Sequence, residues 1–449
     1  MNPAAPTVRL TSLDAFRGIV MLLLIPNAFE GWAMDTMRER LPDNPVVVFL
    51  QTQLSHAAWT GCHLWDLIMP SFLFIAGVSL AYSRAARVHD GATFRQAFVH
   101  SLLRAAILMV LGLFLMITVE ANIDLLWPLL LLALGLPLGK WLGRLLGRGE
   151  SFPAKTVDNV LAVTVLTASI AWLWINSRRS NWAFHDVLPQ LALAYVPAFL
   201  IAGRSLRAQI LTVVAILVGY WLAFALYPLP PADLNPASVG IVPGDEVFTG
   251  LFAHWNKGTN IAAHFDAWFL NVMPRYEPFV FNSHGYVTLN FIPSTASVML
   301  GVITGDLMRR GGDPRLIRNR LLWTGVAALV GGWVLGQTLC PLVKSIWTPS
   351  WVIFSTGWSL LFFAAFYHAC EVRSRTRWAL PLVVAGLNPI TLYVFSRYFR
   401  YWILEVWRRP TQGVLFDGVW APVAEAAAVM ISLWLMAYVM YRLRIFVRI

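Results

Sequence analysis

His56 is the residue whose chemical type and setting best suit catalysis. It lies in the segment SHAAWTG, between two apolar runs, 15–32 and 64–83, that are each about long enough to cross a bilayer. A neutral imidazole, with a pKa of about 6.5, can act as a general base or accept an acyl group. Asp66 follows in the chain, where it could orient His56 or a substrate amine, or cap the second run. The alternative for His56 is an interfacial histidine that bonds only to backbone.

Three polar side chains lie in or beside the first apolar run, where ionisable groups are costly. Asp14 and Arg17 share one helix face, so they can form an ion pair that orients the span, or Arg17 can help to hold a phosphate. Asn27 would lie about 15 Å further along the same helix. There it suits a carbonyl-orienting or oxyanion role, or a bond to a neighbouring helix.

The composition indicates an integral membrane protein. Of 449 residues, 58% are hydrophobic and only 13% are charged, against about a quarter charged in soluble proteins. The formal net charge is +11, but most arginines lie at the ends of apolar runs, where topology signals and lipid headgroups explain them. Nucleic acid is therefore not an expected partner. The three cysteines lack metal-ligand spacing, so we predict no metal, and we expect Cys62 to be a packed thiol rather than a nucleophile.

The apolar runs predict an all-α polytopic protein with about 12 transmembrane helices and both termini in the cytoplasm. The arginines that follow alternate runs satisfy the positive-inside rule, and the aromatic and basic group 397–409 suggests an interfacial helix. The predicted spans are 15–32, 64–83, 98–118, 123–142, 159–175, 187–202, 208–227, 287–308, 321–340, 351–370, 380–395 and 419–441.

Two predicted outer loops stand out. The first, 33–63, contains His56. The second, 228–286, is rich in Pro, Gly, Asn and His, and its interior segment HFDAWFLNVMP predicts a short amphipathic helix. Because a structureless loop of this length is uncommon in a compact protein, we expect it to form a cap over the outer mouth.

A longer pattern surrounds His56. SLDAFRG (12–18) opens the first run, Asn27 lies near its end, and HAAWTG (56–61) precedes DLIMPSFLF (66–74). In order and spacing these segments resemble the motifs of the membrane acyltransferases related to heparan-α-glucosaminide N-acetyltransferase. FHDVLPQLALAY, AHFDAWFL, TLNFIPSTASVMLGVITGDLM and GLNPITLYV resemble further motifs of that family, with departures at Pro189 and Leu191, so the likeness covers nearly the whole chain.

The resemblance implies that His56 takes part in acetyl transfer from acetyl-CoA. The other candidate catalytic residues are Asn27 and Asp66. The candidate residues for binding acetyl-CoA and for lining its path are Arg17, Asp14, Asn290, Asn388 and Arg84, of which Arg84 is also explained by topology alone. The candidate substrate-binding residues are Trp59, Trp65, Asp266 and Trp268; the tryptophans could stack on a sugar ring or anchor the protein at the interface.

The resemblance also implies a function for the whole chain, 1–449, as a single domain with a ten-helix core and an inserted hairpin at 123–175. Acetyl would pass from cytoplasmic acetyl-CoA to an acceptor, an amino sugar or glycan, at the outer side of a bacterial inner membrane. The pantetheine arm of CoA is about 15–20 Å long, roughly half the thickness of the hydrocarbon core of the bilayer, so it could carry the thioester from the cytoplasmic side toward His56. A homodimer is expected by resemblance. The alternative is a secondary transporter of sugars or amino sugars, which proline-interrupted helices and intramembrane charges also suit.

Overall fold

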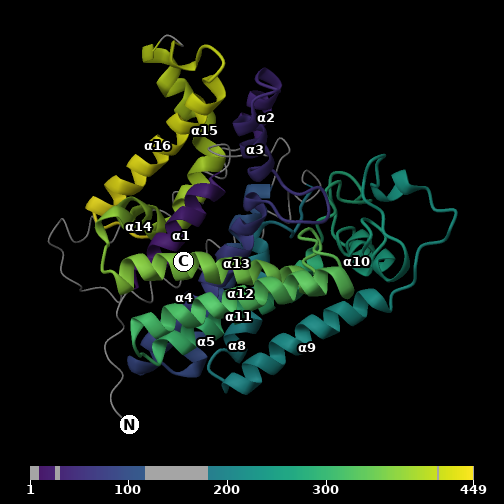
Figure 1. Ribbon diagram of the computed structural model, residues 1–449, viewed down its shortest axis with the longest axis horizontal. Helices are drawn as coiled ribbons and strands as arrows, with labels where there is room; N and C mark the ends of the chain where they lie inside the picture. Colours follow the sequence, from purple (N-terminus) through teal and green to yellow (C-terminus); the bar gives the residue numbers. More distant parts are fainter. Residues whose placement is uncertain (1–9, 26–30, 117–180, 412–413, 448–449) are drawn as a thin grey trace.

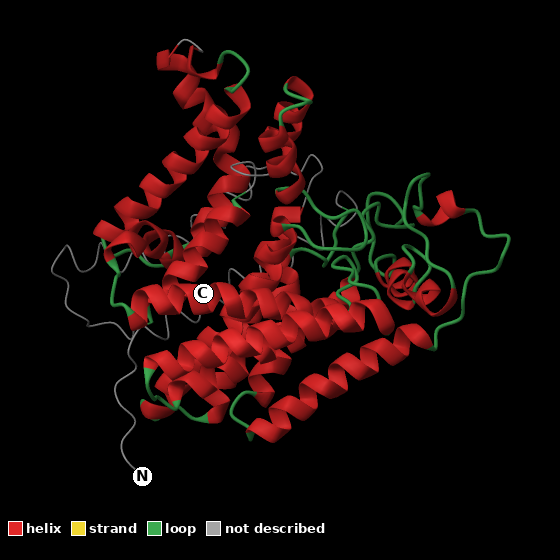
Figure 2. Ribbon diagram, in the orientation of Figure 1, coloured by secondary structure: helices red, strands yellow, loops and turns green. Residues whose placement is uncertain are grey.

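The protein is built from helices. The computed structural model describes residues 10–25, 31–116, 181–411 and 414–447. Within them every regular element is a helix, and β-type pairing is confined to one isolated antiparallel bridge between Thr60 and Val343 (Figure 2). The predicted hairpin 123–175 and Asn27 lie outside the described residues.

The α-helices differ widely in length, from short connecting pieces to elements that can cross a membrane. They are α1 (Thr11–Leu24), α2 (Gly31–Arg40), α3 (Pro45–Gln53), α4 (Ile68–His89), α5 (Phe94–Met116), α8 (Val187–Ile201), α9 (Leu206–Ala225), α10 (Ile261–Phe269), α11 (Phe291–Arg309), α12 (Pro314–Thr338), α13 (Pro349–Tyr367), α14 (Leu380–Leu387), α15 (Pro389–Thr411) and α16 (Ala421–Arg442). Short turns precede three of them: η1 (Leu64–Leu67) leads into α4, η6 (Thr288–Asn290) into α11 and η8 (Arg377–Ala379) into α14.

Seven helices in the described part of the chain are long and apolar enough to cross a membrane, so the protein is a polytopic, membrane-embedded one. They confirm the predicted spans at 64–83, 98–118, 208–227, 287–308, 321–340, 351–370 and 419–441. The pair η8–α14 and α15 would add an eighth span, but it bends by 69°. α8, where a span was predicted at 187–202, is apolar but shorter than the seven.

Two predicted boundaries are wrong, for local reasons. The helix predicted at 15–32 begins at Thr11 and ends at Leu24, where Ile25 is extended because Pro26 follows it. The interfacial helix expected around 397–409 is the second part of α15, which runs on from Pro389 because its interior holds no helix-breaking residue before Pro410.

Helices α4, α11 and α13 form the centre of the main core, beside α5, α8, α9 and α12; α1 joins them to a second group of α14, α15 and α16 (Figure 1). α4 and α11 touch through glycines: a Cβ on Gly77 would lie 1.9 Å from the carbonyl oxygen of Val298, and one on Gly301 would lie 2.1 Å from that of Phe74. Close backbone approach of this kind is typical of membrane helix pairs.

The two long predicted loops contain short helices. The segment 33–63 includes most of α2 and all of α3, and the segment 228–286 includes α10, which confirms the short helix predicted there although it begins three residues earlier than the quoted segment. Figure 1 shows the second segment, in teal, gathered at one end of the helices. We call this end, with η1, η6 and residues 341–348, the histidine end; the opposite end, with the C-termini of α4 and α11, is the arginine end.

Candidate functional site

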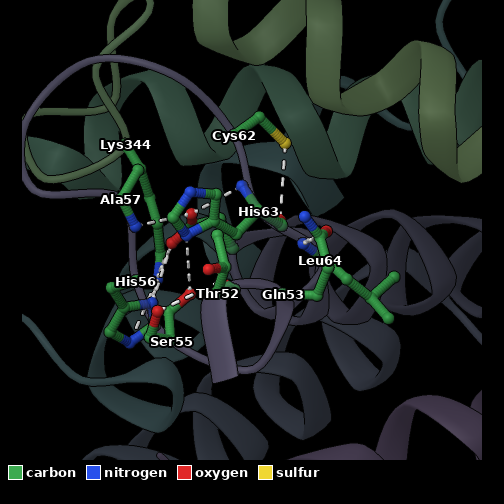
Figure 3. Close-up of polar contacts among 10 residues, drawn as sticks. Thr52, Gln53, Ser55, His56, Ala57, Cys62, His63, Leu64 and Lys344 are labelled. Atoms are coloured by element: carbon green, nitrogen blue, oxygen red, sulfur yellow. Dashed lines mark hydrogen bonds and ion pairs between the residues drawn. The ribbon is translucent and has the colours of Figure 1, made fainter. Parts of the chain in front are cut away.

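His56, Asp66 and Lys344 form one hydrogen-bonded cluster at the histidine end, and Figure 3 shows His56 and Lys344 beside each other. The Nδ1 atom of His56 lies 2.8 Å from Oδ1 of Asp66 and 2.9 Å from Nζ of Lys344. Lys344 also donates to Oδ1 of Asp66 over 3.2 Å. Asp66 and Lys344 have side chains only 2% and 10% exposed, whereas that of His56 is 47% exposed. The cluster therefore presents an imidazole on a buried ion pair.

The local fold of η1 fixes Asp66 beneath His56. Its second carboxylate oxygen, Oδ2, accepts the backbone N–H groups of Ala57 and His63, at 3.1 and 3.0 Å. The ring of His63 in turn contacts the carbonyl oxygen of Ser55 at 3.1 Å. Asp66 thus caps the turn that opens α4 and also contacts His56, so both of the placements predicted for it occur together.

Lys344 reaches the cluster because its segment is tied to the loop after His56. Thr60 and Val343 form the isolated bridge, and the N–H of Gly61 donates to the carbonyl of Leu342 over 3.1 Å. Gly61 has φ +104°, a backbone conformation that side-chain-bearing residues rarely adopt. The chain can therefore turn at Gly61 and bring residues far apart in the sequence into contact.

Further bonds hold the segment that carries Lys344. Asn290 donates to the carbonyl of Ser345 over 2.8 Å, and the Tyr220 hydroxyl donates to that of Ile346 over 3.0 Å. Trp347 has φ +49°, which is strained for a tryptophan, but its ring is buried and its indole N–H donates to Ser297. These contacts hold the backbone on both sides of Lys344, while its amine is held by His56 and Asp66.

The electrostatic setting keeps His56 neutral. Partial burial of the ring lowers its pKa below the ordinary value, and the positive charge of Lys344 lowers it further, against the opposing effect of Asp66. Cys62, close by in the chain, behaves oppositely: burial, helped by the nearby Asp66, raises its thiol pKa to about 12. A neutral imidazole can accept a proton near pH 7, whereas a thiol with that pKa is not a nucleophile there.

Aromatic side chains form one wall of the cluster. Tyr286 lies edge-on to His56, with ring centroids 6.4 Å apart, and the amine of Lys344 lies 5.7 Å from its ring centroid. His185 stacks on Tyr286 at 5.6 Å, and His284 lies beside it. Sugar rings stack well on such surfaces because their C–H faces are apolar, although none of these side chains belongs to the predicted substrate-binding set.

The predicted polar residues Asn290 and Asp266 both lie at the histidine end. Asn290 is buried in η6 and holds the Lys344 segment, so the structure places it at the histidine end. Asp266, in α10, is 2% exposed and accepts the N–H of Thr288 through Oδ2. Burial raises the pKa of Asp266 to about 6.

The three predicted tryptophans are placed differently from one another. Trp59 is buried and packs against Gly285, next to the wall residue Tyr286. Trp65 is half-buried against the main core. Trp268 is 65% exposed on α10 and packs against Phe265. Trp59 and Trp65, which directly precedes Asp66 in η1, are therefore beside the cluster, whereas Trp268 lies on the exposed side of α10.

The arginine end gathers a different set of side chains. Arg17 donates to Asp14 over 3.1 Å and to Ser79 of α4 over 2.6 Å, so the ion pair predicted within α1 is present and also links α1 to α4. Ser12 bonds to Glu371, in the turn His368–Val372 that follows α13, through both its N–H and its hydroxyl. These contacts fix the relative positions of the helices at this end.

A cavity of about 270 Å³ lies at the arginine end, between the turn before α9 and the last residues of α11. Arg204, Arg309 and Arg310 line it, together with Asp306, which pairs with Arg309. The guanidinium of Arg84 packs directly against Gly203 at the edge of this cavity. A set of guanidiniums around a hollow is suited to a phosphorylated ligand.

Asn388 is placed apart from both sets. It lies at the bend between α14 and α15, fully buried, where it donates to the carbonyl of Ile445 over 3.0 Å and accepts the N–H of Val447 over 2.9 Å. Its amide therefore fastens the C-terminal segment, and the structure does not bring it together with His56.

Lys344 is the main participant that sequence reasoning missed. It lies 288 residues from His56 in the chain, so no local spacing connects them. One signal was available: the sequence has only four lysines among its 34 basic residues, and Lys344 is the one basic residue of the short outer connection, 341–350, between two predicted spans. A rare cation in such a position is unexplained by the positive-inside rule.

Comparison with known proteins does not add a family assignment. No family model matches the chain, and no curated protein matches it significantly. In the described part of the chain, no group of three His, Cys, Asp or Glu side chains is arranged to hold a metal ion.

Proposed function

We propose that the protein is a membrane acetyltransferase that moves an acetyl group from acetyl-CoA at the arginine end to an amine or hydroxyl at the histidine end. The observation that carries the proposal is the position of a neutral histidine on a buried Asp–Lys pair at one end of α4, with an arginine-lined cavity at its other end. The helix separates Asp66 from Arg84 by about 25 Å. The pantetheine arm of CoA, with the bonds of the pyrophosphate, is long enough to cover most of that distance.

In this mechanism the Nδ1–H of His56 donates to Asp66 and leaves a lone pair on Nε2. His56 takes a proton from the acceptor as its nitrogen or oxygen attacks the thioester carbonyl; the carbon–sulfur bond breaks, and the proton passes to the leaving CoA thiolate. Alternatively, Nε2 attacks the thioester first, the carbon–sulfur bond breaks and CoA thiolate leaves. The acceptor then attacks the acetyl group on Nε2, the nitrogen–carbon bond breaks, and the acceptor's proton passes to the thiolate. Asp66 stabilises the imidazolium formed in the first route, and Lys344 keeps the resting ring neutral.

The resemblance in sequence supplies the remaining parts of the proposal. The acceptor is an amino sugar, the protein lies in the inner membrane of a bacterium with the arginine end facing the cytoplasm, and it forms a homodimer.

The transporter remains the competing function, and the feature that favours it is the bend between α14 and α15, since broken helices are common in carriers. At that bend, however, both polar atoms of the Asn388 side-chain amide bond to backbone, so this amide is not free to bind a solute.

The proposal is tested by measuring the release of free CoA when purified protein in detergent is given acetyl-CoA and glucosamine. The wild type should release CoA only when the amine is present, and His56→Ala should release at least about 100-fold less. His89→Ala, a change at an exposed histidine of the other end, is the control and should act like the wild type. If His56→Ala keeps its rate, acetyl transfer through His56 is wrong; if acetyl-CoA does not bind at all, the transporter is favoured.

A further inference from the structure

An apolar groove lies on the membrane-spanning surface close to the histidine end. Its volume is about 230 Å³, and α9, α10 and the start of α11 form it. On α9 the residues Ala215, Gly219 and Ala223 recur every fourth position and so lie on one face, where they are exposed. Ile261, Leu289 and Ile292 form the facing wall. A Cβ built on Gly219 would meet nothing within 4 Å, so the floor of the groove is open.

The groove belongs to a helix that is apolar around its exposed side. α9 is among the helices long and apolar enough to span a membrane, and its exposed side chains include Leu211, Val214, Val218 and Leu222. At that position the surrounding medium is hydrocarbon rather than water. The occupant suited to the groove is therefore an alkyl or prenyl chain that enters from the bilayer.

The groove connects to the His56 cluster through two short links. Tyr220, in its wall, donates to the carbonyl of Ile346, two residues from Lys344. Leu289, in the facing wall, lies between Thr288 and Asn290, and Asn290 bonds to Ser345. A chain seated in the groove would place its polar head beside the segment that carries Lys344.

Buried polar atoms lie where that head would be. Oδ1 of Asn290 is buried and finds no hydrogen-bond partner among the described residues, and beside it in the chain the Thr288 side chain meets the carboxyl of Asp266. The Asn290 oxygen is costly to bury unpaired, and a hydroxyl or amine group of a saccharide would satisfy it.

We infer that the acceptor is a lipid-linked amino sugar, whose apolar chain lies in the groove of Ala215, Gly219 and Ala223 while its sugar reaches His56. This inference rests on the proposed acetyl transfer and names the class of its acceptor. A free sugar would use the polar atoms but would leave the apolar groove without a role.

The test compares glucosamine with dodecyl β-glucosaminide as acceptors, by CoA release, in wild type and in Gly219→Leu. Leucine fills the open space at Gly219 and favours the helix, so the fold should be kept. Gly331→Leu is the matched control: this glycine also lies in a membrane-spanning helix, α12, with open space around it. Wild type and both variants are assayed in the same detergent. Partition of the dodecyl acceptor into micelles therefore affects all three proteins equally and cannot cause a difference in acceptor preference between them.

In the wild type, kcat/KM for the dodecyl acceptor should exceed that for glucosamine by at least about tenfold, because several methylenes are buried. Gly219→Leu should remove most of this preference and leave the glucosamine rate unchanged, whereas Gly331→Leu should retain it. Equal use of the two acceptors, or a preference that survives Gly219→Leu, overturns the inference and leaves acetyl transfer standing.

A second readout does not depend on turnover. A dodecyl glucosaminide with a diazirine in its chain should label α9 or the start of α11 in the wild type and in Gly331→Leu, but not in Gly219→Leu. Equal labelling by a diazirine phosphatidylcholine would mean that the groove holds bulk lipid, which overturns the inference. Labelling by the glycolipid without any His56-dependent CoA release would instead contradict the proposed function, and with it the role of the bound lipid as acceptor.

Discussion

The two ends of α4 carry opposite kinds of polar chemistry. At the histidine end, an imidazole, a carboxylate and an amine lie within 3.5 Å of one another, and two of the three are buried. At the arginine end, guanidiniums line a cavity without forming one compact network, and Arg204 and Arg310 are exposed. A compact cluster can fix a proton at one atom, whereas a ring of separate cations can accommodate a large anion.

This difference predicts that changes at the two ends will affect different kinetic constants. A change in the His56 cluster should lower kcat, because it acts on proton transfer, and should leave acetyl-CoA binding intact. A change in the arginine-lined cavity should raise KM for acetyl-CoA, because it acts on binding that is equal in the ground and transition states. The following variants test this separation, from the largest effect to the smallest.

Asp66→Asn should cause the largest loss, about 100-fold or more in kcat. Asparagine removes the charge that favours Nδ1–H on His56 and stabilises the imidazolium, and it leaves Lys344 without its anion. CoA release measures the loss, and the KM for acetyl-CoA serves as the internal control, since a damaged fold would change it as well. A kcat within about threefold of the wild type would mean that Asp66 only caps α4.

Arg204→Gln should raise KM for acetyl-CoA about tenfold with kcat unchanged, the effect of losing one charge-assisted hydrogen bond to a phosphate. Arg204 is exposed and lines the cavity, so its removal should not disturb the core. Arg207→Gln is the matched control, an exposed arginine of the same turn of chain that does not line the cavity. Equal effects of the two variants would show a general surface charge effect and would move the CoA site elsewhere.

Much of the helical frame could be predicted from the sequence, because an apolar run of span length has no stable alternative to a helix in a bilayer. The seven helices that matched the predictions are runs of this kind. The boundary at Leu24 was predictable too, since Pro26 restricts Ile25, but the length of the apolar run concealed it.

The site was predictable only where its parts are near in sequence. His56 and Asp66 belong to one loop and the turn that follows it, so a contact between them was among the expected placements. Lys344 comes from the other half of the chain through the Thr60–Val343 bridge, a tertiary contact that no local pattern encodes. Asn388, by contrast, was a polar residue in an apolar run whose partner proved to be the backbone of the C-terminal segment.

Lys344→Met should shift the pH dependence of the reaction rather than abolish it. The active form of His56 is the neutral one, so kcat rises with pH through the pKa of His56, which burial and Lys344 hold below its ordinary value. Without the cation that pKa rises, and the acidic limb of the profile should move to higher pH. Lys344→Arg keeps the charge and should leave the limb in place. An unmoved limb in Lys344→Met would assign Lys344 to the fold alone.

Asp266→Asn should produce the smallest effect, and one on stability. Burial raises the pKa of Asp266 to about 6, above the value of about 3.8 that it has when exposed, so the folded protein binds this proton more tightly than the unfolded chain. The free energy of unfolding therefore increases as pH falls through 6. This added stability is complete below about 3.8 and is lost as pH rises above 6. Asparagine removes the titrating group, so the unfolding temperature in detergent should vary less between pH 7 and pH 4.5 than in the wild type. Asp233→Asn, an exposed position of the same loop, should keep the wild-type variation. If the unfolding temperature of Asp266→Asn changes with pH as much as that of the wild type, the Asp266 carboxylate is solvated in the folded protein. The polar atoms at the histidine end would then bind water rather than an acceptor.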